Sequence, residues 1–101
     1  MSSPPTLEDA FARAPHVVSR RVAGECILVP LASRGADIDS IYDLNAIGAF
    51  IWEHLDGTRP GTEVVRLLTE AFEVEPARAA ADYLAFVEQL TAIGVICLTP
   101  A

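Results

Sequence analysis

The sequence predicts one small α+β domain, in which a three-stranded antiparallel sheet precedes three helices. Three observations support this. Short runs rich in β-branched residues fill the first half of the chain, and helical four-residue spacing of apolar residues starts after Asn45. The chain has 101 residues, of which 51% are hydrophobic, enough for one modest core. A second domain does not fit this length.

The first two strands are expected at residues 16–21 and 25–31, because both runs are rich in β-branched residues and Ala23-Gly24 between them is typical of a hairpin turn. A polar turn around Gly35 then leads to a third strand at residues 38–44. Because successive side chains of a strand point to opposite faces, that strand has one mostly apolar face and one mostly polar face. The apolar face carries Ile38, Ser40, Tyr42 and Leu44, and the other carries Asp39, Ile41 and Asp43.

The first helix begins after Asn45, whose side-chain oxygen can accept from free amides of the first turn. Its apolar positions Ile47, Ile51 and Leu55 recur every four residues, with Trp52 beside them, and Gly57 suits the residue after a helix end. Tyr42 and Trp52 are expected in the core.

The other two helices each begin near a proline. The second is expected at about residues 60–72 and the third at about 76–93. Their predicted core positions are Val64, Leu67, Leu68, Phe72, Tyr83, Phe86, Val87, Leu90 and Ile93. The sequence leaves open whether residues 95–98 form a strand.

Residues 1–15 are expected to be a flexible tail, with one helical turn around residues 7–13, and residues 16–101 to form the domain. No apolar run reaches the length of a membrane span and no signal peptide precedes the domain, so a cytoplasmic location without membrane contact is expected. Cys26 and Cys97 lack neighbouring ligands, so no metal or cofactor is expected and both are predicted to be buried.

The net charge of −7 argues against nucleic-acid binding, because the chain has no stripe of basic residues that could contact phosphates.

The sequence also gives no support for catalysis. His16 and His54 are isolated, and Arg59 is expected to pair with a carboxylate such as Asp56, so no catalytic residues are assigned.

The predicted element order is that of a small winged helix-turn-helix-like domain, and several residues resemble the PqqD-like family. That family carries Tyr-x-Leu-Asn at a strand end, then Gly-Ala-x-Ile-Trp, Leu-Asp-Gly-x-Arg, an apolar helix, and a Phe-Leu-x-x-Leu…Gly-Leu-Ile ending. The matching positions here are Tyr42, Leu44, Asn45, Gly48, Trp52, residues 55–57, Arg59, Phe86, Leu90 and residues 94–96.

The resemblance implies a non-catalytic chaperone that binds the leader segment of a ribosomally made precursor peptide and presents it to a modifying enzyme, such as a radical S-adenosylmethionine protein. It implies that the peptide adds as a strand to the edge of residues 38–44. The apolar excess on the third helix predicts a second wall of the groove. The expected peptide-binding residues are Ile38, Asp39, Ser40, Ile41, Tyr42, Asp43, Ala80, Leu84 and Val87.

Other interpretations of the same patterns remain open. The alanines of the third helix suit a simple helix former equally well, and Asp39 and Asp43 suit either a soluble strand edge or selection of basic leader residues. An open edge also allows a homodimer. A winged-helix DNA-binding regulator shares the architecture, although the acidic charge disfavours it, and a scaffold subunit that recruits an enzyme is a third possibility.

Overall fold

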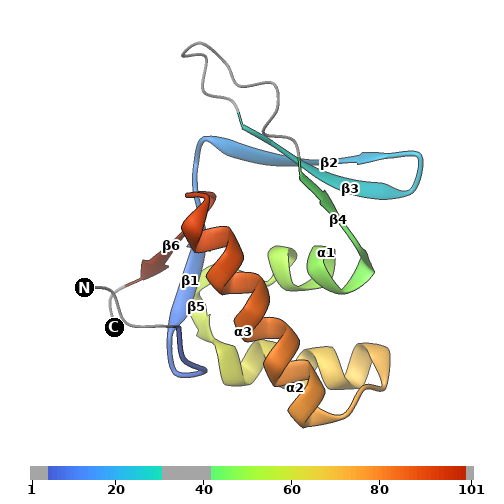
Figure 1. The fold of residues 1–101 in the computed structure, drawn as a ribbon, viewed down its shortest axis with the longest axis vertical. Coiled ribbons are helices and arrows are strands. Elements are labelled where there is room, and N and C mark those ends of the chain that lie inside the picture. The colour runs from blue at the N-terminus through green and yellow to red at the C-terminus, as the bar shows by residue number, and fades with distance from the viewer. Residues whose placement is uncertain (1–4, 31–41, 100–101) are drawn as a thin grey trace.

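The computed structural model describes residues 5–30 and 42–99, which form a layer of three helices with two small antiparallel sheets (Figure 1). The helices are α1 (Ala46–Glu53), α2 (Gly61–Phe72) and α3 (Pro76–Ala92). The strands are β1 (Ala10–Arg13), β2 (Val17–Val22), β3 (Glu25–Pro30), β4 (Tyr42–Leu44), β5 (Asp56–Pro60) and β6 (Ile96–Thr99). One sheet has the order β2-β3-β4 and the other β5-β1-β6. The predicted α+β class is confirmed.

The hairpin sheet, β2-β3-β4, contains the three predicted strands. Its first turn has Ala23 and Gly24 at φ 53° and 85°, the left-handed pair that a two-residue hairpin loop requires. β3 then pairs with β4 through Cys26 opposite Leu44, which leaves β4 at the edge. The part of the predicted third strand at residues 38–41 lies outside the described residues.

The terminal sheet, β5-β1-β6, was not predicted, apart from the open possibility of a strand at 95–98. The helical turn expected at residues 7–13 is wrong, because β1 occupies the centre of this sheet and pairs with both β5 and β6. Ala14, directly after β1, is 5% exposed, so the packed part of the chain begins before residue 16. Gly57 does have a positive φ of 87°, but it lies inside β5 rather than at a helix end.

The helices begin and end close to the predicted residues. Asn45 caps α1, since its Oδ1 accepts from the Gly48 amide at 2.8 Å. α1 ends at Glu53, before the predicted Leu55, which is nevertheless buried. α2 and α3 are joined through Glu73, which takes the left-handed conformation at φ 53° and ends α2.

The core lies between the helices and the inner faces of both sheets. Its largest fully buried side chains are Trp52, Tyr83, Leu28, Ile51, Leu55, Leu68, Val64 and Val87. Burial, with a smaller contribution from Asp9, raises the pKa of Tyr83 to about 12. Within residues 5–30 and 42–99, no helix combines the length and apolar character needed to cross a bilayer.

Four predicted core positions are less buried than expected. Phe86 is half-buried and Ile93 is 38% exposed, because the last turns of α3 extend past the core toward β4. Leu67 and Phe72 are also only half-buried. Cys26 is buried as predicted, whereas Cys97 is exposed on the edge strand β6, so that prediction was wrong for Cys97.

Candidate functional site

The candidate site begins with the outer edge of β4. Among the described strands β4 pairs with β3 alone, so the backbone groups on its other side have no strand partner there. In a sheet, alternate N–H and C=O groups of an edge strand point away from the paired neighbour and can accept an added strand. The edge therefore offers a template for an extended peptide.

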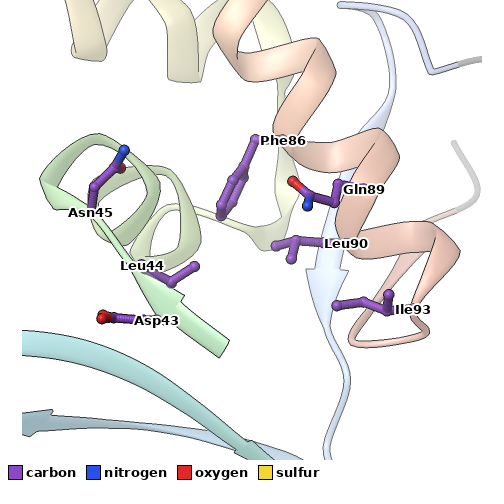
Figure 2. A pocket seen from close by; sticks show the side chains of 7 residues that line it. All are labelled: Asp43, Leu44, Asn45, Phe86, Gln89, Leu90 and Ile93. Carbon is purple, nitrogen blue, oxygen red and sulfur yellow. The ribbon is translucent and has the colours of Figure 1, made fainter. Parts of the chain in front are cut away.

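Beside this edge lies a pocket of about 190 Å³ between β4 and the last turns of α3 (Figure 2). It is lined by Asp43, Leu44, Asn45, Phe86, Gln89, Leu90 and Ile93. The apolar side chains approach from both sides, and in Figure 2 Leu44 points toward Leu90, while Gln89 lies beside Leu90 on α3 and Asn45 lies where β4 leads into α1. The pocket can hold an apolar side chain with a few polar groups at its margin.

The N-terminus of α1 helps to shape this pocket. A Cβ built on Gly48 would lie 3.0 Å from Phe86 Cε1 and 3.3 Å from the capping oxygen of Asn45. Only a residue without a side chain lets the Phe86 ring approach α1 this closely. Gly48 and the Asn45 cap thus fix the position of the ring that forms one wall.

Two of the residues predicted to form the second wall of the groove lie elsewhere on α3. Ala80 and Leu84 are half-buried against the core and do not line the pocket. At about 100° per residue they fall on one side of the buried stripe of α3, and Phe86, Gln89 and Ile93 fall on the other. The wall that faces β4 is therefore the opposite flank from the one predicted.

Val87 also requires a correction. It was expected at the margin of the peptide surface, but its exposure is 0% and it packs in the core between those two flanks. Of the residues predicted on the edge strand, Asp43 lines the pocket and Tyr42 lies in β4, while residues 38–41 are outside the described part of the chain. Sequence reasoning missed Phe86, Gln89, Leu90 and Ile93 as site residues.

The sequence carried only a partial signal for the missed wall. Phe86, Leu90 and Ile93 were assigned to the core because they share the apolar stripe of α3, yet a stripe that also includes Tyr83 and Val87 is wider than one buried face requires. The excess lies toward the C-terminal end of α3, the end that approaches β4.

Two carboxylates lie close together on β3 and β4, and that of Asp43, which also lines the pocket, points away from Leu44 (Figure 2). Asp43 pairs with Ile27 across the strands, and Glu25 lies two residues from Ile27 on the same face of β3. A hydrogen bond with Asp43 when Glu25 is protonated, together with the charge of Asp43, raises the pKa of Glu25. Among the described residues, neither carboxylate forms an ion pair with a cation.

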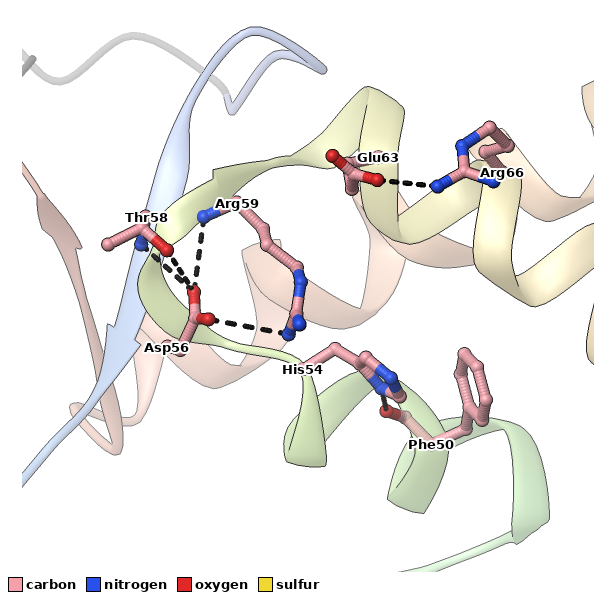
Figure 3. A network of polar contacts seen from close by, with 7 residues as sticks. All are labelled: Phe50, His54, Asp56, Thr58, Arg59, Glu63 and Arg66. Carbon is pink, nitrogen blue, oxygen red and sulfur yellow. Dashed lines mark hydrogen bonds and ion pairs between the residues drawn. The ribbon is translucent and has the colours of Figure 1, made fainter.

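A second carboxylate centre, at Asp56, is structural (Figure 3). Asp56 Oδ1 accepts from the Thr58 amide at 3.0 Å, the Thr58 hydroxyl at 2.9 Å and the Arg59 amide at 3.1 Å. The Thr58 amide and hydroxyl, with smaller contributions from the amide and charge of Arg59, lower the pKa of Asp56 to about 2. The predicted pairing of Arg59 with Asp56 is confirmed at 3.3 Å. These groups are satisfied by one another, so they are not directed at a ligand.

Neither His16 nor His54 lines the pocket. His54 Nδ1 donates to the Phe50 carbonyl at 2.7 Å, one turn back along α1. Over the described ranges, no group of three or more His, Cys, Asp or Glu side chains is arranged to hold a metal ion. The geometry at the pocket suits binding.

Two solved structures share this fold. A structure of TbiB1 in complex with the TbiA(beta) leader peptide has a TM-score of 0.68 and 21% identity, covering 84% of this chain and 93% of that one. A lasso peptide synthetase B1 complexed with the leader peptide has a TM-score of 0.71 and 24% identity, covering 86% and 96%. No curated protein matches the sequence.

The family comparison covers most of the chain. Residues 25–96 match the family described as coenzyme PQQ synthesis protein D. These residues include β3, β4 and all three helices, so the match spans every element that lines the pocket. The chain belongs to the PqqD family.

Proposed function

We propose that this protein is a non-catalytic binder of the leader segment of a ribosomally made precursor peptide. The leader adds as a strand to the open edge of β4 and places an apolar side chain in the pocket between β4 and α3. The observation that carries the proposal is the adjacency of two features: a strand edge that has no partner among the described strands, and a pocket with apolar and polar lining residues that begins at the same strand.

The energetics suit a reversible peptide partner. Each main-chain hydrogen bond to β4 contributes about 0.5–1.5 kcal/mol net, and burial of one large apolar side chain contributes about 1.5–3 kcal/mol. A few such bonds with one or two anchors, less the ordering of the peptide, correspond to Kd values near the micromolar range. Affinity of this order permits capture and later release.

Membership of the PqqD family and the two similar structures, each complexed with a leader peptide, support the same role. The bound leader would be presented to a modifying enzyme, such as a radical S-adenosylmethionine protein, in the cytoplasm. Without leader, the β4 edge could pair with a second copy, and that homodimer would compete with the peptide.

The first test is an amide NMR titration with the leader segment of a short precursor peptide encoded beside the gene, with a DNA duplex as control. We expect shifts at β4 and at Phe86, Leu90 and Ile93 with the peptide alone. Shifts with DNA alone would indicate a winged-helix regulator, and the absence of shifts from any neighbouring leader would contradict the proposal.

The pocket is tested by paired substitutions of exposed apolar residues. Ile93 lines the pocket and is 38% exposed, whereas Leu98 is 56% exposed on β6 and does not line it. Ile93→Gln should weaken leader binding about 5–10-fold because an apolar contact is lost, while Leu98→Gln should leave it unchanged. Leu84→Gln changes the other flank of α3, the one predicted from the sequence to contact the peptide. If Leu84→Gln weakened leader binding and Ile93→Gln did not, the flank predicted from the sequence would be the one that contacts the leader.

A further inference from the structure

The pleat of β4 determines which side of an added strand each of its residues faces. Residues directly opposite each other on neighbouring strands place their side chains on the same face, and successive residues alternate faces. The leader residue opposite Asp43 therefore shares the face of Asp43, and its two chain neighbours share the face of Leu44. A one-residue slip of the peptide changes which leader residues take these places but not the alternation.

The two faces of β4 differ sharply in chemistry. Leu44 is 9% exposed and points toward α3, where Phe86 and Leu90 complete the apolar pocket (Figure 2). Asp43 also lines the pocket, but it is exposed and its side chain points the opposite way from that of Leu44. An added strand thus meets apolar surface on one side and carboxylates on the other.

In the described part of the chain, no cation forms an ion pair with the carboxylates of this face. Glu25 lies beside Asp43 and is exposed, and the residue between Asp43 and the next cation is the uncharged Ile27. That cation, Arg20, stands on β2, two strands from Asp43 and one strand from Glu25, and no ion pair joins it to either carboxylate. A basic side chain on the added strand would lie much closer to Asp43, at about 5 Å between Cβ atoms.

We propose that the leader is selected by an apolar–basic–apolar alternation, in which a Lys or Arg faces Asp43 and Glu25 while its two neighbours face the Leu44 side and the pocket. This inference rests on the proposed function and specifies its substrate class. A basic leader residue would be attracted to Asp43 and Glu25 across the strands, whereas an acidic residue in the same place would be repelled by both carboxylates.

The test uses three synthetic nonapeptides, Thr-Ser-Thr-Leu-X-Leu-Thr-Ser-Thr, with X as Lys, Gln or Glu, titrated by NMR beside the natural leader. We expect the order Lys, Gln, Glu, with Lys bound about 5–10-fold more tightly than Glu at low salt. The difference should shrink to about twofold at 0.5 M salt, because the pair is exposed and screened.

Two protein variants locate the charge effect. Asp43→Asn should reduce the Lys-to-Glu preference to about threefold or less, whereas Glu88→Gln, which removes an exposed charge away from the pocket flank of α3, should leave it intact. Equal binding of the three peptides, or failure of the Lys peptide to shift β4 while the natural leader does so, would overturn the alternation and leave the proposed function standing. If neither the leader nor any nonapeptide shifts β4, both proposals fail.

Discussion

The two sheets of this domain are built from different kinds of chain segment. The hairpin sheet, β2-β3-β4, follows the chain in order and ends in an open edge beside the pocket. The terminal sheet, β5-β1-β6, joins segments from the beginning, middle and end of the described chain. The first carries the candidate site, and the second ties the N- and C-terminal segments to the helices.

The carboxylates of the two sheets show the same division. In the terminal sheet Asp56 accepts three hydrogen bonds and pairs with Arg59, and its pKa is lowered to about 2. In the hairpin sheet Asp43 and Glu25 face each other, and the pKa of Glu25 is raised. Satisfied charge stabilises the fold, whereas charge left without an opposite partner is available to a ligand.

The largest expected effect lies where the terminal sheet meets the helices. A Cβ on Gly61 would lie 2.6 Å from the Tyr83 ring and 3.1 Å from the Leu7 backbone, in a position that cannot open without moving both. Gly61→Ala should therefore lower the free energy of unfolding by about 2–3 kcal/mol in urea denaturation. Thr62→Ala, at the exposed next position, is the control, and an equal loss there would refute the steric explanation.

The Asp56 turn should give the next largest effect. Asp56→Ala removes three hydrogen bonds at a partly exposed site, and we expect a loss of about 1.5 kcal/mol at pH 7. Because the folded pKa is about 2 against an ordinary 3.8, this stabilisation is complete above pH 3.8 and disappears as the pH falls toward 2. Asp82→Ala, which removes a carboxylate 3.7 Å from the Arg78 guanidinium, should show no such loss at pH 7.

The hairpin sheet can be strengthened at its first turn. Ala23 has a φ of 53°, a conformation that costs an alanine about 1 kcal/mol and that asparagine accepts more readily. Ala23→Asn should raise the free energy of unfolding by about 0.5–1 kcal/mol and leave leader affinity unchanged. Ala12→Asn in β1, at an ordinary strand position, should instead destabilise the fold. A stabilised Ala12→Asn would show that the turn is not the cause.

The smallest stability effect is expected at the exposed carboxylate pair. Asp43→Asn removes the repulsion from Glu25 and should raise the melting temperature by about 1–2 °C at pH 7. Since the pKa of Glu25 is raised in the folded protein, the repulsion is present at neutral pH and is lost as the pH falls through the titration of Glu25, so the gain should fade in acid. A gain that persists in acid would point to another cause.

The sequence predicted the features that depend on residues close together in the chain. The Ala23-Gly24 turn, the Asn45 cap and the near bounds of α2 and α3 follow from local backbone preference and apolar spacing, and all three are present. The same local signals placed the hairpin strands within a residue or so.

Only the tertiary structure decided the terminal sheet and the pocket wall. β1 and β5 carry weak strand signals, Ala-Phe-Ala-Arg and a segment with Gly57 and Pro60, and they become strands because they pair with distant partners. Likewise, a wide apolar stripe on α3 does not reveal which of its flanks will meet β4, since that depends on how the helix crosses the sheet. Local secondary-structure preference depends on neighbouring residues, whereas the pairing of strands that are distant in the sequence is determined only when the hydrophobic core forms.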